Sequence, residues 1–265
     1  MSKIICRIYG GLGNQLFQIN ALLNLKIHSE KNINYFLDLS GLNDYEIDRD
    51  YEVNKLFNFD FKKTNSIINK LRLAKIFKLK TKLITFVNDL NYVNLSQKKI
   101  NSHNIYLDGY FQNIPSIESE SIMLLKKKFL GNSKIQCDAI IHIRGSDFLT
   151  NKKYKFDVNK YYKNALSELS KHYKNKNIHV ITDDNNYSIS ILDKIQSDYK
   201  FIYTSMNLVD DFSMIVNANF KIISTSTFSF WAALMGEDKS NLIIAPKTWF
   251  NGERRIYKLK NELNV

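Results

Sequence analysis

Residues 3–39 read KIICRIYGGLGNQLFQINALLNLKIHSEKNINYFLDL and combine a strand, a turn, a helix and a second strand. The opening KIICRIY is rich in Ile, as is typical of a strand, and Gly10 and Gly11 end it. Apolar residues then recur at the spacing of one helical face, at Leu16, Ile19, Leu22, Leu23 and Ile27. This order predicts a parallel α/β unit, because parallel strands are joined by crossovers that are usually helices.

The same alternation returns after residue 137. Strands are expected at residues 138–145, 177–184, 200–205 and 220–226 and within 241–250. Helices are expected between them, at residues 158–174, 186–196, 208–218 and 228–235. We therefore predict an α/β fold with two Rossmann-like domains, at 1–130 and 131–265, whose doubly wound parallel sheets face each other across a cleft.

The composition is that of a globular protein. Of 265 residues, 44% are hydrophobic and 24% charged, which excludes a disordered chain. Cys6 and Cys137 lie in strand-like stretches outside any Cys or His cluster, so neither a disulfide framework nor a structural zinc site is expected. A signal peptide and an apolar run of membrane-spanning length are both missing from the sequence, which predicts a cytoplasmic protein.

The formal net charge is +12, which favours an anionic partner: nucleic acid, a phosphorylated small molecule or an acidic membrane. Part of this charge is local, because residues 62–82 carry eight basic residues and no acidic one. This segment is expected to form an amphipathic helix in the N-terminal domain. Its lysines form either a solvated face or a peripheral contact with the anionic inner face of the plasma membrane.

The segment GGLGNQLFQ at 10–18 lies between a strand and a helix. Glycines there let a ligand or a phosphate approach the main-chain amides, although a tight turn explains them about as well. A turn does not explain the amide side chains of Asn14 and Gln15. Gly11, Gly13 and Gln15 are therefore candidate substrate-binding residues, and Asn14 is a candidate catalytic residue.

The segment HIRGSDF at 142–148 lies at the carboxyl end of a strand, where parallel α/β sheets bind ligands. The guanidinium of Arg144 can make paired hydrogen bonds to a diphosphate, and it stays charged. A surface ion pair between Arg144 and Asp147 is an equal alternative. His142 alone is more typical of a packed strand residue than of a catalytic base, and its place at this strand end makes it a candidate substrate-binding residue.

Two further strand ends carry polar groups. At 223–229, hydroxyl groups and the unpaired amides of a helix start meet around Ser226, Thr227, Phe228 and Ser229, which suits an anion, although simple helix capping is the common alternative. Asp183 and Asp184 end VITDD and would either bind a base or ribose or cap the next helix.

Asp48 and Asp50 have the spacing of metal-binding carboxylates in many sugar transferases. Their surroundings, NDYEIDRDYEV, form a polar loop without a strand that would hold an octahedral ligand set. We therefore expect no metal site.

Six short elements occur in order: GGLGNQLFQ at 10–18, LDGYFQ at 107–112, HIRGSD at 142–147, VITDD at 180–184, STFSFW at 226–231 and APKTWF at 245–250. Together they resemble the bacterial alpha-1,2-fucosyltransferases of glycosyltransferase family 11. Each element is moderately specific, and the ordered set is highly specific. Gly145 stands where the family has a second arginine, and Phe230 replaces the first tryptophan of the family's pair.

The resemblance implies a GT-B-like architecture and metal-independent, inverting transfer of fucose from GDP-fucose, with no cofactor. It implies that the C-terminal domain binds the donor, that Arg144 holds the diphosphate and that Asn14 lies near the diphosphate or the fucose. Asp147 would act as the base at the acceptor hydroxyl or orient Arg144. The family's usual acceptor is a galactose in a surface polysaccharide such as O-antigen or capsule.

Two other classes remain open. An alpha-1,6-fucosyltransferase would share the arginine motif but carry two adjacent arginines, so Gly145 and the GGLGNQ opening favour the 1,2 family. A nucleic-acid-binding protein would explain the charge, but zinc-finger spacing and an aromatic RNA-binding motif are both missing from the sequence.

Overall fold

The computed structural model describes residues 2–29, 33–43, 49–64, 84–92, 104–112, 119–131, 135–145, 157–249 and 257–265. The chain divides into two compact units, Met1–Leu130 and Gly131–Val265, and each is described by itself.

The described part of the first unit contains a five-stranded parallel sheet in the order β3-β2-β1-β5-β4. Its strands are β1 (Ser2–Arg7), β2 (Ile33–Asp38), β3 (Lys62–Lys63), β4 (Ile84–Val87) and β5 (Asn104–Leu107). The central strand β1 pairs with neighbours on both sides, so that Ile4 lies opposite Tyr35 and Ile105. Its Ile and Cys side chains are buried, which explains the apolar run at the start of the sequence.

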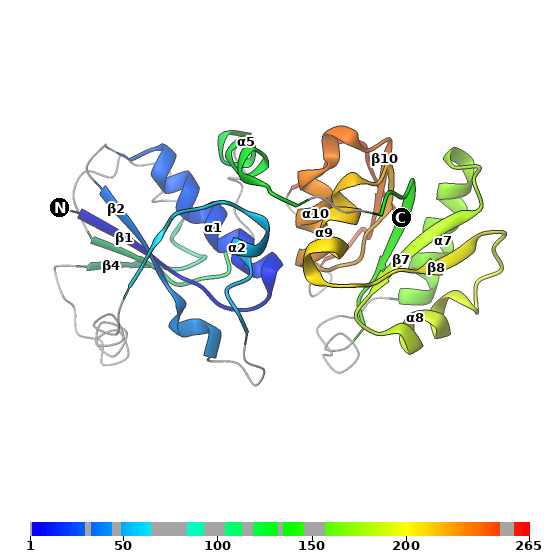
Figure 1. Cartoon of the computed structure of the whole chain (residues 1–265), viewed down its shortest axis with the longest axis horizontal. Helices are drawn as coiled ribbons and strands as arrows, with labels where there is room; N and C mark the ends of the chain where they lie inside the picture. The colour runs from blue at the N-terminus through cyan, green and yellow to red at the C-terminus, as the bar shows by residue number, and fades with distance from the viewer. Residues whose placement is uncertain are drawn as a thin grey trace. The chain divides into compact units, whose positions relative to one another are not determined.

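Helix α1 (Leu12–Ile27) packs against β1, and almost all of its residues are buried. Helix α5 (Ser119–Lys128) packs against α1, where the Ser121 hydroxyl donates to Asn20 Oδ1 at 2.8 Å. The short elements η1 (Leu39–Asn43) and α2 (Val53–Leu56) follow β2 along the chain (Figure 1). The sequence predicted one apolar face for α1, whereas the structure buries this helix on more than one side.

The described part of the second unit contains a six-stranded parallel sheet in the order β11-β10-β9-β6-β7-β8. Its strands are β6 (Ala139–Ile143), β7 (Asn177–Thr182), β8 (Lys200–Tyr203), β9 (Phe220–Ile222), β10 (Leu242–Ala245) and β11 (Glu262–Asn264). Its helices are α7 (Val158–His172), α8 (Asn185–Leu192), α9 (Leu208–Asn217) and α10 (Thr227–Met235), followed by the short η2 (Glu237–Lys239). Helices α7 and α8 cover one face of the sheet and α9 and α10 the other, as right-handed crossovers in two directions require (Figure 1).

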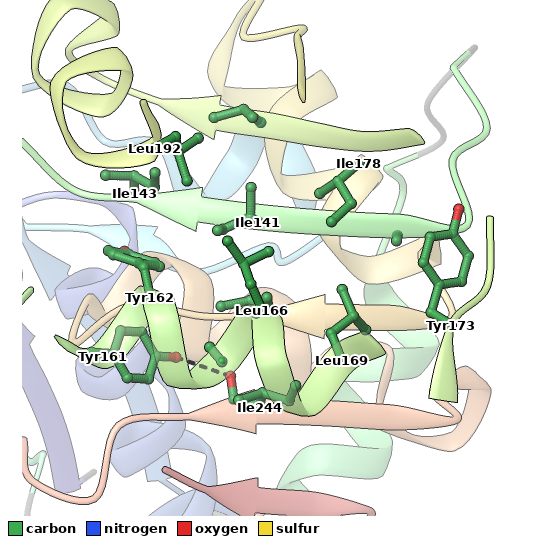
Figure 2. Close-up of a cluster of buried hydrophobic side chains, with 14 of the residues drawn as sticks. Ile141, Ile143, Tyr161, Tyr162, Leu166, Leu169, Tyr173, Ile178, Leu192 and Ile244 are labelled. Carbon is green, nitrogen blue, oxygen red and sulfur yellow. Dashed lines mark hydrogen bonds between the residues drawn. The ribbon is translucent and has the colours of Figure 1, made fainter. Parts of the chain in front are cut away.

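The core beneath α7 shows how the sequence pattern produces this packing. Tyr161, Tyr162, Leu166 and Leu169 share one face of α7 and lie on the buried strands β6 and β10 (Figure 2). The Tyr161 hydroxyl donates to the carbonyl of Ile244 at 3.2 Å, so its polar end is satisfied inside the core. Burial of each large apolar side chain here contributes about 1.5–3 kcal/mol.

The second sheet has a point where the strand connections diverge. The chain leaves β6 toward β7 on one side, whereas β9 leads to β10 on the other, so the switch lies between β6 and β9. In the first sheet β1 leads to β2 and β4 leads to β5 in the same direction, and the carboxyl ends of β1 and β5 lie side by side. Ligands of open parallel sheets bind beyond the carboxyl ends of the strands at such points.

The prediction of an α/β fold with two parallel sheets is confirmed. The predicted basic helix at 62–82 was wrong at its start, because Lys62 and Lys63 form β3 and pair with Phe36 and Leu37. Residues 65–82 lie outside the described residues. The short strands β4 and β11 were not predicted.

Candidate functional site

Arg144 is the first residue after β6, at the switch point of the second sheet. Its Nη1 atom lies 2.7 Å from Asp183 Oδ2, and the other carboxylate oxygen of Asp183 accepts the amide of Gly145 at 2.7 Å. Asp183 follows the neighbouring strand β7, so two strand ends are joined by one carboxylate. The Arg144 side chain is about one quarter exposed, so it is reached by solvent at this edge of the sheet.

Asp147 and Ser146 lie outside the described residues. The ion pair of Arg144 with Asp147, one of the two alternatives that the sequence offered, therefore stays a prediction, and the structure describes an ion pair of Arg144 with Asp183. A strand-end carboxylate next to an arginine is typical of an oriented cation.

Asp184 is the N-cap of α8 and accepts the amide of Tyr187 at 3.0 Å. The sequence offered two roles for Asp184, binding a base or ribose and capping a helix, and the structure shows a hydrogen bond for the second. Asp184 also explains the glycine at 145, because a Cβ atom there would lie 2.5 Å from Asp184 Cβ. A second arginine at this position would need the backbone to shift.

His142 lies on β6, almost fully buried, with its Nδ1 atom 2.8 Å from Ser224 Oγ. Burial and the neighbouring charge of Arg144 lower the pKa of His142 to about 3. The ring is therefore neutral near pH 7. It joins β6 to the turn that follows β9, which suits the packed role expected for a strand histidine.

That turn begins helix α10 and carries the predicted anion site. Ser226 is the N-cap, but its side chain makes no capping hydrogen bond to the helix. The Ser229 hydroxyl instead donates back to the Ser226 carbonyl at 3.2 Å. Phe228 packs against His142 and Phe212, with ring centroids 5.7 and 5.4 Å apart. The first amides of α10, including that of Thr227, therefore lack a serine cap and face the carboxyl edge of the sheet.

The glycine loop of the first unit is built differently. Gly10 has φ +77°, a backbone conformation that favours glycine, whereas Gly11 is extended and is the N-cap of α1. The amide of Leu12 donates to Glu52 Oε2 at 2.8 Å, so a carboxylate of this chain already occupies the helix start. Burial raises the pKa of Glu52, and the hydrogen bond from Leu12 opposes that shift.

Gln15 is fully buried and clamps this loop. Its Nε2 atom donates to the carbonyls of Gly10 and Asp50, both at 2.8 Å, and its Oε1 atom accepts the amide of Glu52 at 2.9 Å. Both amide hydrogens thus have protein partners. These contacts explain the amide side chain at the helix start, because Gln15 holds the glycine loop against residues 50–52.

Asn14 and Gly13 lie in the first turn of α1, and Gly13 is buried. Asn14 is partly exposed, and its Oδ1 atom accepts Gln112 Nε2 at 2.8 Å. This bond joins the opening GGLGNQ element to the LDGYFQ element, 98 residues later. The structure therefore links Asn14 to the loop that follows β5, the strand next to β1.

Sequence reasoning missed two carboxylates. Glu52 caps α1 from a loop that showed no pattern, and Asp89 follows β4 and accepts the amides of Tyr110 and Phe111. The rule that selected Asp183, a carboxylate after a buried strand, also fits Asp89. It was not applied because the four-residue β4 was not recognised.

Among the described residues, no three His, Cys, Asp or Glu side chains gather as metal ligands would. Asp50 lies 3.7 Å from Lys55 Nζ, and Asp48 lies outside the described residues. In the described part of the chain, helices of the length and hydropathy needed to cross a bilayer do not occur.

The family model named Glycosyl transferase family 11 matches residues 57–263. The chain belongs to this family. The matched stretch contains five of the six ordered sequence elements, all but the glycine loop, and it includes Arg144 and the start of α10. The prediction of a family 11 glycosyltransferase is thus confirmed at the level of the family.

Two relatives of this family 11 chain come from Escherichia coli. An alpha-1,2-colitosyltransferase is 27% identical over 283 residues, which cover 96% of this chain and 94% of the relative. The O-antigen biosynthesis glycosyltransferase WbnK is 27% identical over 291 residues, which cover 93% and 94%.

Solved fucosyltransferases share the fold. NodZ alpha-1,6-fucosyltransferase soaked with GDP-fucose matches with a TM-score of 0.57 and 12% identity over 92% of this chain and 94% of that one. NodZ from Bradyrhizobium gives a TM-score of 0.53 at 12% identity over 88% and 92%. Arabidopsis thaliana FUT1, in a mutant complex with GDP, gives 0.52 at 10% identity over 89% and 68%. The predicted GT-B-like fold is confirmed, whereas donor, linkage and site residues stay predictions.

Proposed function

We propose that this family 11 enzyme transfers L-fucose from GDP-fucose to O2 of a terminal galactose in a surface glycan, with inversion and without a metal ion or cofactor. One observation carries the proposal: Arg144, held by Asp183, and the α10 start, which has no serine cap, follow the two strands that flank the switch point of the second sheet. A glycan acceptor and a 1,2 linkage are supported by the names of the relatives, and the donor by the GDP-fucose soaked into NodZ.

The proposed reaction forms a bond from the acceptor oxygen to the anomeric carbon of fucose and breaks the bond from that carbon to the diphosphate oxygen. The electron pair of the broken bond leaves with GDP, so negative charge grows on the diphosphate. Arg144 and the first amides of α10 are fixed donors that stabilise this charge. Asp183 keeps the guanidinium in place, so little reorganisation is needed during transfer.

The acceptor proton needs a base, and Asp147 is our candidate. Its alternative role is to orient Arg144, which also pairs with Asp183. As the base, Asp147 would accept the proton while the acceptor oxygen bonds to the anomeric carbon. From the first unit, Asn14 and the glycine loop are proposed to lie near the fucose, and the diphosphate is held by the second unit.

The test is an assay with GDP-fucose and lactose, with the linkage of the product determined by NMR. We expect an alpha-1,2 product, released GDP and, without lactose, slow hydrolysis of the donor. An alpha-1,6 product would support the other linkage, and GDP-fucose that is neither hydrolysed nor transferred would overturn the proposal.

The 27% identical alpha-1,2-colitosyltransferase favours a second donor, GDP-colitose. Colitose is fucose without its 3-hydroxyl, so the same phosphate site would serve both. The ratio of kcat/KM for the two donors distinguishes them. A site that hydrogen-bonds the 3-hydroxyl should prefer fucose, because the analogue leaves that group unpaired.

A further inference from the structure

The loop after β5 has a strained backbone at a bulky residue. Phe111 has φ 57°, a left-handed conformation that is rare for aromatic side chains. Its ring is buried and packs against Tyr92 with centroids 5.2 Å apart. Such strain persists only where the surroundings hold it, and it gathers at functional sites.

Asp89 supplies that hold. Its Oδ2 atom accepts the amide of Tyr110 at 3.1 Å, and its Oδ1 atom accepts the amide of Phe111. Asp89 lies in the turn after β4, so the loop is fixed to the neighbouring strand end. Two hydrogen bonds from consecutive amides to one carboxylate set the direction of the chain at Tyr110.

Tyr110 is 37% exposed, whereas the flanking Gly109 and Phe111 are buried. Its ring meets the ring of Tyr9 edge to face at 4.8 Å. The Arg7 guanidinium lies over the Tyr9 ring at 5.0 Å and is paired with Asp108 at 3.0 Å. Tyr110 is thus an exposed ring on a rigid base, with little freedom to lose on binding.

The place of this ring in the fold is that of a ligand site. Tyr9 follows β1 and Tyr110 follows β5, so the pair lies beyond the carboxyl ends of two paired parallel strands, the edge of the sheet where ligands bind. The amides of Asn14 and Gln112 join the same two loops. An aromatic ring next to amide and carboxylate groups is the combination that suits a sugar, whose ring has an apolar face and a rim of hydroxyls.

We propose that Tyr110 is the platform on which the acceptor sugar stacks, and that Asp89 is the residue that positions it. The inference rests on the proposed function, because it takes the acceptor to be a galactoside. It assigns acceptor binding to the carboxyl ends of β1 and β5 in the first unit, next to the strained backbone at Phe111.

The first test compares Tyr110→Ala and Tyr110→Phe with the parent, using lactose as the acceptor. We expect the KM for lactose to rise at least tenfold in Tyr110→Ala and to stay within threefold in Tyr110→Phe, which keeps the ring. Donor hydrolysis without lactose should be unchanged in both. Leu90→Ala is the matched control, because it removes an 89% exposed apolar side chain from the same turn as Asp89.

The second test asks whether Asp89 acts through Tyr110. Asp89→Ala should raise the KM for lactose, and the double variant with Tyr110→Ala should be no worse than Tyr110→Ala alone. Additive losses would show that Asp89 does not act through the ring. Melting temperatures identify a variant that fails to fold, and Tyr110→Ala then decides the question.

The outcomes separate this inference from the proposed function. A parent enzyme that transfers to lactose while Tyr110→Ala keeps the parental KM overturns the platform alone. A parent that hydrolyses GDP-fucose but gives nothing to lactose removes the galactoside acceptor and the platform together. Loss of donor hydrolysis in folded Tyr110→Ala would place the ring at the donor and overturn its role at the acceptor.

Discussion

His142 lies on β6 and Arg144 directly follows this strand, but the two side chains have different surroundings. Arg144 keeps an exposed portion and pairs with Asp183, whereas His142 is buried against Ser224. Burial and the charge of Arg144 keep the imidazole neutral. Sequence position identified both residues, but a carboxylate 39 residues away from Arg144 decides how that arginine is held, which sequence spacing does not reveal.

Arg144→Lys should reduce transfer strongly, because lysine keeps the charge but loses the planar fork that can hold both Asp183 and a phosphate. We expect kcat to fall about 100-fold, which corresponds to about 3 kcal/mol, with a smaller change in KM. Steady-state kinetics with GDP-fucose measures both constants, and thermal melting checks the fold. A folded variant with parental turnover would make the arginine structural.

Acid should destabilise the protein through His142. Its pKa is lowered to about 3 in the folded state, whereas the unfolded side chain titrates near 6.5. Between these values the unfolded state binds the extra proton, so stability falls as pH falls. This group should make unfolding about 2 kcal/mol easier at pH 5 than at pH 7.5. Urea titrations of the parent and His142→Asn at both pH values measure the difference.

The expected result is that His142→Asn loses most of this pH dependence, whatever its stability at pH 7.5. His28→Asn is the control, because His28 is exposed. An unchanged pH dependence in His142→Asn would mean that the buried ring is not the source.

At the scale of elements, the helix starts differ in whether a side chain of the protein caps them. Helices α7, α8 and α9 begin at Asp157, Asp184 and Asn207, whose side chains accept amides of their first turns. The start of α1 is occupied by Glu52, and the Ser226 side chain leaves the start of α10 without a cap. The difference marks α10 as the helix start suited to an anion.

Replacing two N-caps should separate these roles. Asn207→Ala removes the hydrogen bonds that Oδ1 accepts from the amides of Val209 and Asp210 and the one that Nδ2 donates to Asp210 Oδ2, and it should cost about 1 kcal/mol of stability without changing GDP affinity. Ser226→Ala should cost less than about 0.5 kcal/mol but weaken GDP binding. Urea unfolding and calorimetric titration with GDP measure the pair. Equal losses of stability would show that Ser226 is an ordinary cap.

The long, strongly patterned elements could be predicted from the sequence, and the short ones could not. Helix α7 has an apolar face over four turns, and β6 and β7 are rich in Ile, with β6 buried along its whole length. In contrast, β3, β4 and β11 have two to four residues. Strands this short carry too few residues for a pattern, and pairing with a neighbour defines them. Lys62 and Lys63 were predicted as helical because they begin a basic, amphipathic segment. The sequence does not show that they pair with β2.

At the scale of the whole molecule, the ordered motifs predicted two parallel sheets, and the structure has them. The assignment of the acceptor to the first unit and of the donor to the second stays a prediction. So does contact with an anionic membrane, since most of the basic segment at 62–82 lies outside the described residues. The net charge of +12 suits either an anionic lipid or a nucleotide donor.

Activity should survive an excess of chelator. The proposed leaving-group stabilisation uses a permanent cation at Arg144 and helix amides, neither of which a chelator removes. The measurement is transfer to lactose with and without EDTA, followed by addition of manganese. Loss of activity that manganese restores, and that Asp48→Ala with Asp50→Ala abolishes, would shift the main charge partner from Arg144 to a metal.

Binding of GDP should protect backbone amides in one unit only. The first amides of α10 lack a serine cap, so a bound diphosphate should slow their hydrogen exchange at least tenfold, together with the amides around Arg144. Peptides from residues 10–18 should not change, because the Leu12 amide is already bound by Glu52. Hydrogen exchange with mass spectrometry compares GDP with guanosine, which has no phosphate and should not protect 223–231. Protection of 10–18 without protection of 223–231 would move the diphosphate to the glycine loop and reverse the assignment of the two units.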